Sequence, residues 1–379
     1  MASITYLTTI RFEPGARGEI ESDLQELGIE RPLIVTDQGI RQAGLLDRLR
    51  RASRVLDQAP AFDDTPTNPT EEATEAAVAR YRENRCDGIV ALGGGSPIDL
   101  AKGVALLATH PGPLKTYAAI LGGRPKITTA VAPVVAVPTT AGTGSEVGRA
   151  ALITLRDGRK LGFLSLHLIP KRAVCDPELT YGLPPRLTAA TGMDAITHCV
   201  ETFLSPLYNP PAEAIALDGL RRAVRHLEAA VSDGSDQVAR REMMMAALEG
   251  GLTFQKGLGA VHALSHPLGG LRELALHHGM LNAVLLAPVL RFNAAAPVAA
   301  EKYAAIRLAL GLAASADLPA FFAGLVERLP LPRTLSEMGV PAEVLEPTAR
   351  AAVLDHSSAT NPRPASEADY RAMLDEAFT

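Results

Sequence analysis

An acid and an imidazole stand four positions apart in the apolar stretch TGMDAITHCVE, residues 191–201. A separation of four places Asp194 and His198 on one face of a helix. There a carboxylate oxygen and an imidazole nitrogen can bind one divalent transition metal ion. For this pair alone, a hydrogen bond inside an ordinary core is the alternative.

A second stretch, AVHALSHPLGGLRELALHHG, gathers four of the chain's nine histidines. They are His262, His266, His277 and His278. Imidazoles surrounded by Ala, Leu and Gly do not form a solvated charged face. Together with the first pair, they predict a metal site whose ligands are held rigidly by helices.

Two glycine-bearing loops follow predicted strands. GGGSPIDLAKG, residues 93–103, follows a strand expected at 89–92, and Ser96 is expected to cap the next helix, with Pro97 in its first turn. Backbone N–H groups in such a loop can face a phosphate, although an ordinary tight turn is the alternative. PTTAGTGSEV, residues 138–147, is expected at the same edge of the sheet unless it is a plain surface loop.

Asp37 ends the predicted strand in RPLIVTD. A carboxylate there can accept hydrogen bonds from the ribose hydroxyls of adenosine and repel a 2′-phosphate, which favours NAD over NADP. Taken alone, an aspartate at this position is more often a turn residue. It precedes the glycine loop, so the strand order must differ from that of the usual dinucleotide fold.

The pattern of elements predicts two domains. Short β-type runs alternate with helical stretches, which is typical of a parallel sheet covered on both faces. A hairpin is expected around Asp157 and Gly158. The second half is rich in Ala and Leu at helical spacing. We expect an α/β dinucleotide-binding domain at 1–180 and an all-α, metal-binding and substrate domain at 181–379.

Composition excludes several partners. The 379 residues carry a net charge of about −5, so no basic surface indicates nucleic acid, and no long apolar run indicates a membrane span. The N-terminal segment lacks a signal-peptide pattern. Three separated cysteines, Cys86, Cys175 and Cys199, favour reduced thiols and a cytoplasmic protein.

A metal ion beside a dinucleotide indicates one kind of chemistry. We expect hydride transfer between nicotinamide and a metal-bound alkoxide or carbonyl. The expected substrate is therefore a small alcohol or aldehyde.

Five motifs in order resemble the iron-containing (group III) alcohol dehydrogenases, over about residues 30 to 292. They are GGGSPIDLAKG, PTTAGTGSEV, DPELTYGLP, TAATGMDAITHCVE and AVHALSHPLGG, and NPRP near the C-terminus fits too. The resemblance implies that family's fold, shared with dehydroquinate synthase-like proteins. It also implies an NAD(H)-dependent, metal-dependent alcohol dehydrogenase or aldehyde reductase, a homodimer, and Fe²⁺, with Zn²⁺ or another divalent ion as alternatives.

The resemblance also implies residue roles. The metal ligands would be Asp194, His198, His262 and His278. His266 would relay a proton or help to position the substrate near the nicotinamide. The cofactor contacts would be Asp37, Asn68, Gly94, Gly95, Ser96, Asp99, Thr139, Thr140, Thr143, Lys160 and Leu179.

This sequence departs from the family pattern in two places. The run LRELALHHG before the last ligand is longer than usual, so His277 remains an alternative to His278. Gly148 and Arg149 stand where many members have Thr-Pro or Thr-Arg. We expect Arg149 to form a structural salt bridge, with recognition of an anionic substrate as the alternative.

Other functions compete with this interpretation. A maleylacetate reductase typically has Asn in place of the aspartate ligand, whereas Asp194 is present here. Reductases of small acid aldehydes, of the 4-hydroxybutyrate or phosphonate type, stay open. A lyase of the dehydroquinate synthase type would need Lys and Arg residues for a phosphate-bearing substrate, and the helical half has few. A non-catalytic metal-binding protein would leave the two glycine-bearing loops unexplained.

Overall fold

The computed structural model describes residues 4, 6 and 8–379. Its contacts divide the chain into two compact units. The sheet unit consists of Tyr6–Thr140 and Gly144–Gly182, and the helical unit contains Leu183–Thr379 with the short segment Ala141–Thr143. The main division lies close to the boundary expected near residue 180. The three-residue segment of the second glycine loop was not expected in the helical unit.

Six parallel strands form the sheet, in the order β1-β8-β5-β4-β2-β3. Their bounds are β1 Thr9–Phe12, β2 Pro32–Val35, β3 Ala61–Phe62, β4 Gly88–Gly93, β5 Val134–Pro138 and β8 Arg172–Cys175. The three predicted strands are confirmed as β2, β4 and β5. Gly93 pairs with Pro138, so the two glycine loops leave neighbouring strands at the same edge of the sheet.

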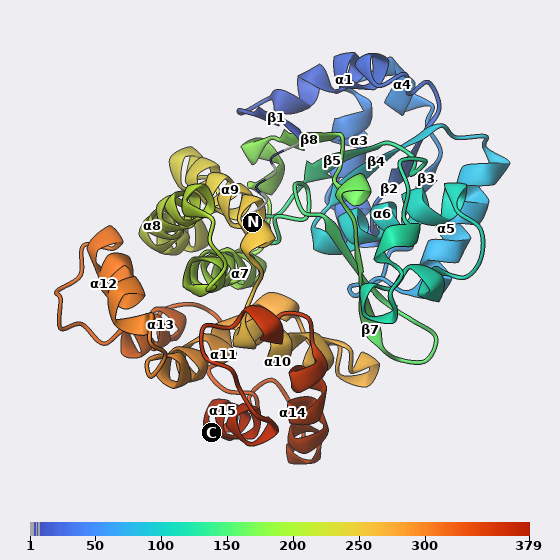
Figure 1. The fold of residues 1–379 in the computed structure, drawn as a ribbon. Helices are drawn as coiled ribbons and strands as arrows, with labels where there is room; N and C mark the ends of the chain where they lie inside the picture. The colour runs from blue at the N-terminus through green and yellow to red at the C-terminus, as the bar shows by residue number, and fades with distance from the viewer. Residues whose placement is uncertain (1–3, 5, 7) are drawn as a thin grey trace. The chain divides into compact units, whose positions relative to one another are not determined.

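Helices cover both faces of this sheet (Figure 1). Alternate side chains of each strand point to opposite faces, so Ile89 and Val90 of β4 belong to different cores. The first core packs against α5 Glu71–Glu83 and α6 Gly95–Thr109. The second packs against α1 Ile20–Glu26, α3 Leu45–Arg50 and α4 Arg54–Asp57. The α/β sheet domain expected from the alternating pattern is confirmed.

The expected hairpin is also present. Strands β6 Ala150–Thr154 and β7 Lys160–Leu164 pair antiparallel. Gly158 in the turn has φ = 84°, a backbone conformation that glycine adopts without a steric penalty. The side chain of Asp157 accepts a hydrogen bond from the backbone N–H of Arg159 and closes the turn.

The helical unit is built from nine named α-helices among its described residues. They are α7 Pro185–Leu204, α8 Pro210–Ser232, α9 Gln237–Leu252, α10 Ala260–Gly269, α11 His278–Asn293, α12 Ala299–Ala309, α13 Leu318–Glu327, α14 Leu345–Leu354 and α15 Glu367–Phe378. Helix α7 packs against α8, α9 and α11, while α10 packs against α11 and α14. This confirms the expected helical second domain.

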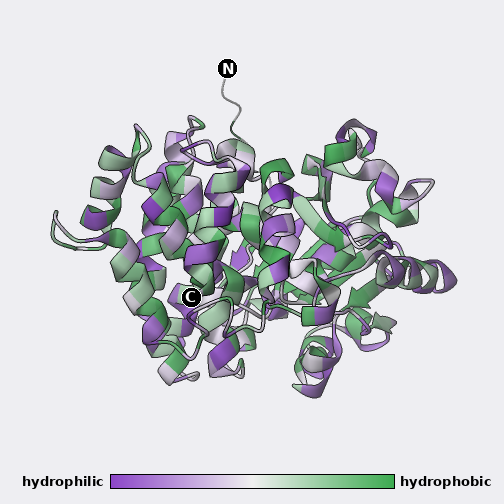
Figure 2. Cartoon of the chain, turned by 90° about the horizontal axis from the view of Figure 1, so that it is seen from below, coloured by the Kyte–Doolittle hydropathy of each residue, from purple (hydrophilic) through white to green (hydrophobic). Residues whose placement is uncertain are grey.

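Hydrophobic and hydrophilic residues mix along most helices of this unit (Figure 2). Helix α7 is buried along most of its length, because every residue from Thr188 to Leu204 is buried. A polar side chain on such a helix must find its partners inside the protein. Within the part of the chain that the structure describes, no helix combines the length and the apolar character that crossing a membrane requires.

Candidate metal centre and cofactor loops

Helix α7 brings the first two predicted metal ligands together. The Nε2 atom of His198 lies 3.4 Å from Oδ1 of Asp194, one helical turn away. Both side chains are almost completely buried. The ring of Phe254 packs edge-on against the His198 ring, with centroids 4.8 Å apart.

Helices α10 and α11 add one imidazole each to this pair. The Nε2 atoms of His262 and His278 lie 3.9 Å and 3.7 Å from Asp194 Oδ1. One donor atom from each of these three residues lies within 4.8 Å of the others. A tetrahedral ion with bonds of about 2.1 Å separates its ligand atoms by roughly 3.4 Å. His198 is not in this group of three, but its Nε2 atom lies 3.4 Å from Asp194 Oδ1, so all three imidazoles approach the same carboxylate oxygen.

A glycine allows α11 to approach α7 this closely. A Cβ atom on Gly279 would overlap the carbonyl oxygen of Ala190 in α7 and would lie 3.4 Å from Cβ of Asp194. The His-Gly pair at the start of α11 thus has a steric reason. His278 can reach Asp194 only because the next residue has no side chain.

Hydrogen bonds at Nδ1, on the side away from the cluster, fix the orientation of two imidazoles. The Nδ1–H of His198 donates to the carbonyl oxygen of Gly142 (3.2 Å), and the Nδ1–H of His262 donates to Oε2 of Glu201 (2.6 Å). Each ring therefore presents the lone pair of Nε2 to the cluster, as a metal ligand must. Burial lowers the pKa of His198 to about 4, so this ring is neutral and able to ligate at pH 7.

Two buried residues beside the ligands were missed by the sequence analysis. Glu201 on α7 holds His262, and Asn282 on α11 places its Nδ2 atom 2.7 Å from Asp194 Oδ1. The spacing of each residue from a predicted ligand was a weak sign that it could lie beside the metal site. Glu201 lies seven positions after Asp194, and Asn282 lies four after His278, so each shares a helical face with a ligand.

His266, the predicted catalytic residue, lies one turn after His262 on α10. Its Nδ1 atom is 2.9 Å from Oδ2 of Asp355, and its ring stacks between those of His278 and His356. Burial opposes ionisation of Asp355, but the charge and hydrogen bond of His266 hold the pKa of that carboxyl below its usual range. The rotation of the His266 ring is therefore restrained.

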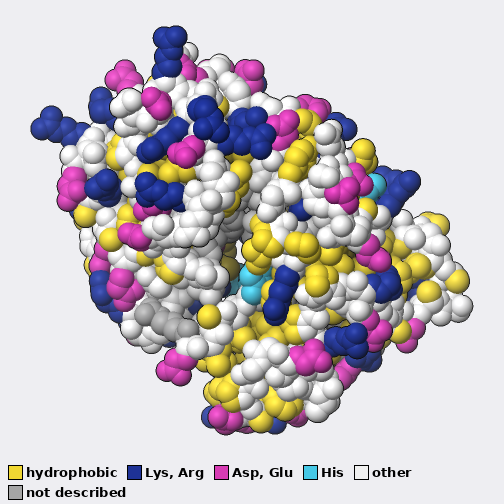
Figure 3. Space-filling model, turned by 180° about the vertical axis from the view of Figure 1, so that it is seen from behind, with side chains coloured by type: hydrophobic (Ala, Val, Ile, Leu, Met, Phe, Trp, Pro, Cys, Tyr) yellow, Lys and Arg dark blue, Asp and Glu magenta, His cyan; other side chains and the backbone are white. Residues whose placement is uncertain are grey.

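The alternative ligand His277 precedes α11 and lies outside the group of donors within 4.8 Å of one another. Burial lowers the pKa of this side chain. The geometry favours His278 over His277 as the residue that faces Asp194. The His278 side chain is 25% exposed, so the cluster is open to solvent at its edge. Figure 3 shows histidine side chains at the surface next to hydrophobic ones.

In the sheet unit, the first glycine loop leads directly into α6. The helix begins at Gly95, and Gly94 is the N-cap without any side-chain hydrogen bond. The prediction that Ser96 caps the helix was wrong, because the helix starts two residues earlier than a Ser96 cap would require, and the Ser96 hydroxyl donates instead to the carbonyl oxygen of Thr67. The first N–H groups of the helix are thus left without a side-chain cap, which suits a phosphate.

Asp99, a predicted cofactor contact, joins this helix to the segment after the second glycine loop. Its two carboxylate oxygens accept hydrogen bonds from Ser145 Oγ (2.6 Å) and from the backbone N–H of Leu152 (3.0 Å). The buried ammonium of Lys102 donates to Ser145 and to the carbonyl of Gly148. Burial lowers the pKa of Lys102 to about 8. Asp99 therefore has a structural role, because it holds α6 against the segment from Ser145 to Leu152.

The remaining predicted cofactor contacts are spread around the edge of the sheet. Thr139 and Thr140 follow β5, and a Cβ on Gly94 would lie 3.2 Å from the Thr140 side chain. Lys160 Nζ donates to Asn68 Oδ1 (3.0 Å). Thr143 belongs to the short segment that is assigned to the helical unit.

Two predicted contacts have clear structural roles. Asp37 caps α2 (Gln38–Gln42) by accepting a hydrogen bond from the backbone N–H of Ile40 (2.9 Å), as the turn interpretation anticipated. Leu179 is buried in the second core of the sheet unit.

Comparison with known families decides what this arrangement belongs to. The profile described as "Iron-containing alcohol dehydrogenase" matches residues 8–177, and the profile of the C-terminal domain of the same family matches residues 188–378. The chain belongs to the iron-containing alcohol dehydrogenase family.

Named relatives of the same length place this family member among dehydrogenases. It is 55% identical to a 4-hydroxybutyrate dehydrogenase of Cupriavidus necator, over 100% of both chains. It is 37% identical to a 1,3-propanediol dehydrogenase of Klebsiella pneumoniae, over 97% of this chain and 96% of the relative. It is therefore an oxidoreductase that acts on alcohol or aldehyde groups.

Solved structures agree with this assignment to the family. A 1,3-propanediol oxidoreductase superposes with a TM-score of 0.93 at 36% identity over 100% of both chains. A sulfoacetaldehyde reductase from Bifidobacterium kashiwanohense, solved in complex with NAD⁺, superposes with a TM-score of 0.89 at 27% identity. That match covers 100% of this chain and 98% of the reductase.

Arg149 marks a departure from the family pattern, and the salt bridge expected for it was wrong. Among the described residues, no carboxylate pairs with its half-buried guanidinium. Burial lowers the pKa of Arg149, and the positive charge of Arg124 lowers it further. Two arginines thus lie near each other while the more buried one lacks an acidic partner.

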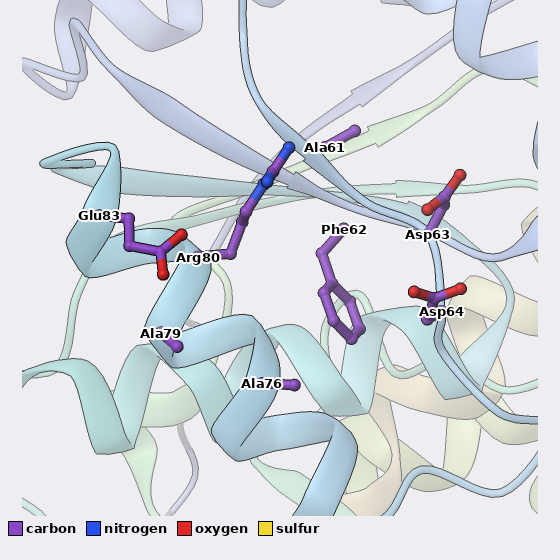
Figure 4. Close-up of a pocket in the computed structure, with 8 residues that line it drawn as sticks. All are labelled: Ala61, Phe62, Asp63, Asp64, Ala76, Ala79, Arg80 and Glu83. Carbon is purple, nitrogen blue, oxygen red and sulfur yellow. The ribbon is translucent and has the colours of Figure 1, made fainter.

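A surface hollow of about 310 Å³ lies beside the end of β3 (Figure 4). It is lined by Phe62, Asp63, Asp64, Arg80 and Glu83, together with three alanines. None of the predicted cofactor contacts lines it, although Asp64 forms a backbone bridge with Asp37. Its walls come from β3, the two residues after it, and α5.

Proposed function

We propose that this member of the family is an NAD(H)-dependent, metal-dependent alcohol dehydrogenase or aldehyde reductase. One observation supports the metal part: three imidazoles from three helices converge on Asp194 Oδ1, and hydrogen bonds at Nδ1 of two of them leave Nε2 facing the cluster. A bound divalent ion would supply a Lewis acid for the oxygen of the substrate. Fe²⁺ is the proposed ion, with Zn²⁺ as the alternative.

The proposed residue roles follow from where the chain places these groups. Asp194, His198, His262 and His278 would hold the ion. His266 would exchange a proton with the substrate hydroxyl or position it, because its Nδ1 is engaged by Asp355 and its ring lies against that of His278.

The uncapped start of α6 at Gly94, Gly95 and Ser96 supports binding of the pyrophosphate of a dinucleotide. Thr139, Thr140, Asn68 and Lys160 lie on loops and a strand of the same unit and are proposed to contact the rest of the cofactor. Asp37 supports NAD over NADP, since a carboxylate repels a 2′-phosphate. A homodimer and a cytoplasmic location remain predictions.

The direct test is an assay of NADH oxidation with small aldehydes and keto acids, on protein loaded separately with Fe²⁺ and Zn²⁺. We expect turnover of an aldehyde that depends on the added metal. Asp194→Ala and His262→Ala should abolish turnover while a fluorescence titration still reports NADH binding. His226→Ala, which removes a histidine of α8 outside the cluster, is the control. Full turnover by metal-free protein would contradict the proposal.

A second, narrower candidate is a dehydrogenase of 4-hydroxybutyrate, whose substrate is a short hydroxy acid. The 55% identity to a relative with this name favours it. Arg149 adds a separate argument, because a half-buried guanidinium with no acidic partner among the described residues suits the carboxylate of a substrate. A neutral alcohol such as 1-butanol would leave that charge unsatisfied.

Arg149→Met separates the two candidates. If Arg149 binds the carboxylate, kcat/KM for 4-hydroxybutyrate should fall roughly tenfold or more, since a hydrogen bond to a charged group contributes about 1.5–3 kcal/mol. Activity on 1-butanol should change little. Arg156→Met removes an exposed arginine of the same hairpin that pairs with glutamates and serves as the control. Equal losses for both substrates would count against the acid-specific candidate.

A further inference from the structure

A second group of potential metal ligands lies in the helical unit, and it contains none of the four ligands of the proposed centre. Its members are His266, Asp355 and His356, and one nitrogen or oxygen atom of each lies within 4.8 Å of the others. The proposed function uses only His266 of these three, and it does not use it as a ligand. The grouping of a second histidine and an aspartate around His266 therefore needs an explanation of its own.

Helix α14 brings the aspartate and the second histidine to α10, which carries His266. Asp355 is the C-cap residue of α14, and His356 follows it. Oδ2 of Asp355 lies 2.9 Å from Nδ1 of His266, and Oδ1 lies 3.6 Å from Nδ1 of His356. Each oxygen of the carboxylate thus has one imidazole nitrogen beside it.

Further contacts restrain the three side chains. The backbone N–H of Ser357 donates to Oδ1 of Asp355 (2.8 Å). The rings of His266 and His356 stack with their centroids 5.5 Å apart and their planes 15° from parallel. Ligands that are already restrained lose little conformational freedom when an ion binds, so this group is partly organised for binding.

Two imidazoles and one carboxylate form a ligand set that suits Zn²⁺. Zinc sites with three protein ligands use these donors and leave the fourth position to water. The distances of 2.9 Å and 3.6 Å lie on either side of the roughly 3.4 Å expected between ligands of a tetrahedral ion. The His356 side chain is 44% exposed, so an ion and its water can reach the group from solvent.

We propose that His266, Asp355 and His356 form a second, weaker zinc site, through which an excess of Zn²⁺ inhibits the enzyme. A neutral imidazole carries one N–H, and in His266 it is on Nδ1, because the carboxylate of Asp355 can only accept. Zn²⁺ bound at Nδ1 would leave that proton on Nε2. The ring would then have no lone pair with which to accept a proton from a substrate hydroxyl. The inhibition rests on the proposed function, whereas the binding of zinc does not.

Zinc binding tests the site itself. Full-length protein without a histidine tag is dialysed against increasing concentrations of free Zn²⁺, and elemental analysis gives the bound zinc per chain. We expect a tight and a weaker equivalent in the wild-type protein, and loss of the weaker one in His356→Phe. Phenylalanine keeps an aromatic ring against His266 but offers no nitrogen, so this variant separates the ligand from the ring contact.

Two further variants frame that result. His356→Cys offers a thiolate, which is a good zinc ligand, and should keep the weaker equivalent. His226→Phe removes a histidine of α8 outside both groups and should bind zinc as the wild-type protein does. This control shows whether loss of any one histidine lowers the zinc content.

Inhibition tests the consequence for the reaction. Oxidation of 4-hydroxybutyrate or 1-butanol by NAD⁺ is followed with added Zn²⁺, and each protein is compared with its own rate before zinc is added. The concentration for half-inhibition should be at least roughly tenfold higher in His356→Phe, since loss of even a supporting partner of a ligand typically weakens binding about 10–100-fold. A chelator should reverse the inhibition of the wild-type protein.

Two results would overturn the inference. They are a weaker zinc equivalent that persists in His356→Phe, or half-inhibition at the same Zn²⁺ concentration in His356→Phe and the wild-type protein. Asp194→Ala separates this site from the proposed centre, because it should lose the tight equivalent and keep the weaker one. If no alcohol is turned over while Asp194→Ala still binds the weaker equivalent, the proposed function fails but the second zinc site stands.

Discussion

Glu201 Oε2 lies 2.6 Å from Nδ1 of His262, and its other oxygen accepts a hydrogen bond from the backbone N–H of Val261. The carboxylate therefore fixes both the ring and the first turn of α10 that carries it. Burial lowers the pKa of His262, but the hydrogen bond and charge of Glu201 outweigh burial and raise it above its ordinary value. A ring held in this way is a stronger base at Nε2 and a better ligand.

Glu201→Gln should weaken metal binding while preserving the shape of the site. An amide can still contact His262 Nδ1, but it lacks the negative charge that raises the basicity of the ring. Loss of such a partner typically weakens metal affinity about 10–100-fold. The dissociation constant from chelator competition checks this.

Glu249→Gln on α9 is the matched control for that change. Burial raises the pKa of Glu249 to about 8, which favours the neutral carboxyl that an amide resembles. Equal metal affinity in Glu201→Gln and the wild-type protein would show that the pair with His262 has no effect on the ion.

Gly279→Ala should lower the metal content of the purified protein. The added methyl group would overlap the carbonyl oxygen of Ala190 and push the start of α11, with His278, away from Asp194. Overpacking of this kind costs about 1–3 kcal/mol, which exceeds the gain of up to about 1 kcal/mol from replacing glycine in a helix. Elemental analysis and the melting temperature measure the two effects.

Gly324→Ala provides the comparison, because its new methyl group would meet only Arg328 Nη1 at 3.7 Å. It should keep its metal and melt at the same or a slightly higher temperature. A full complement of metal in Gly279→Ala would contradict the steric account of the His-Gly pair.

Asp37→Ser should relax the preference for NAD over NADP. Serine retains the cap on Ile40 of α2, so the change removes the negative charge without removing the helix cap. We expect the ratio of kcat/KM for NADPH to that for NADH to rise at least tenfold. An unchanged ratio with intact folding would mean that Asp37 serves only as the cap.

Local patterns predicted the parts of this protein that depend on sequence neighbours. The spacing of Asp194 and His198 was enough to place them on one face of α7, and short Val and Ile runs were enough to find β2, β4 and β5. Strand order was not readable, because alternating strands and helices are compatible with several orders in a parallel sheet. The sequence also did not show that the carbonyl oxygen of Gly142, in the loop after β5, accepts a hydrogen bond from the Nδ1–H of His198.

Glu201 and Asn282 were missed for a related reason. A glutamate or asparagine in a helix ordinarily faces solvent, and only the packing of another helix decides otherwise. Their roles depend on α10 and α7 lying across the faces that carry them, which no local pattern encodes.

Glu146→Gln should change how stability depends on pH. Burial raises the pKa of Glu146 from 4.5 to about 7, although its own backbone hydrogen bond and Lys102 oppose the rise. Between these values the folded protein keeps a proton that the unfolded chain releases, so this group makes the protein less stable as pH rises from 4.5 to 7. Below that window both states hold the proton, and above it both are ionised.

The Glu146→Gln variant lacks this loss of stability, so its unfolding free energy relative to wild type should increase by up to roughly 3 kcal/mol as pH rises across the window. Urea unfolding of both proteins at several pH values measures the difference between their unfolding free energies. The contributions of all other titrating groups cancel in this difference. Parallel curves would mean that Glu146 is already ionised in the folded protein at pH 5.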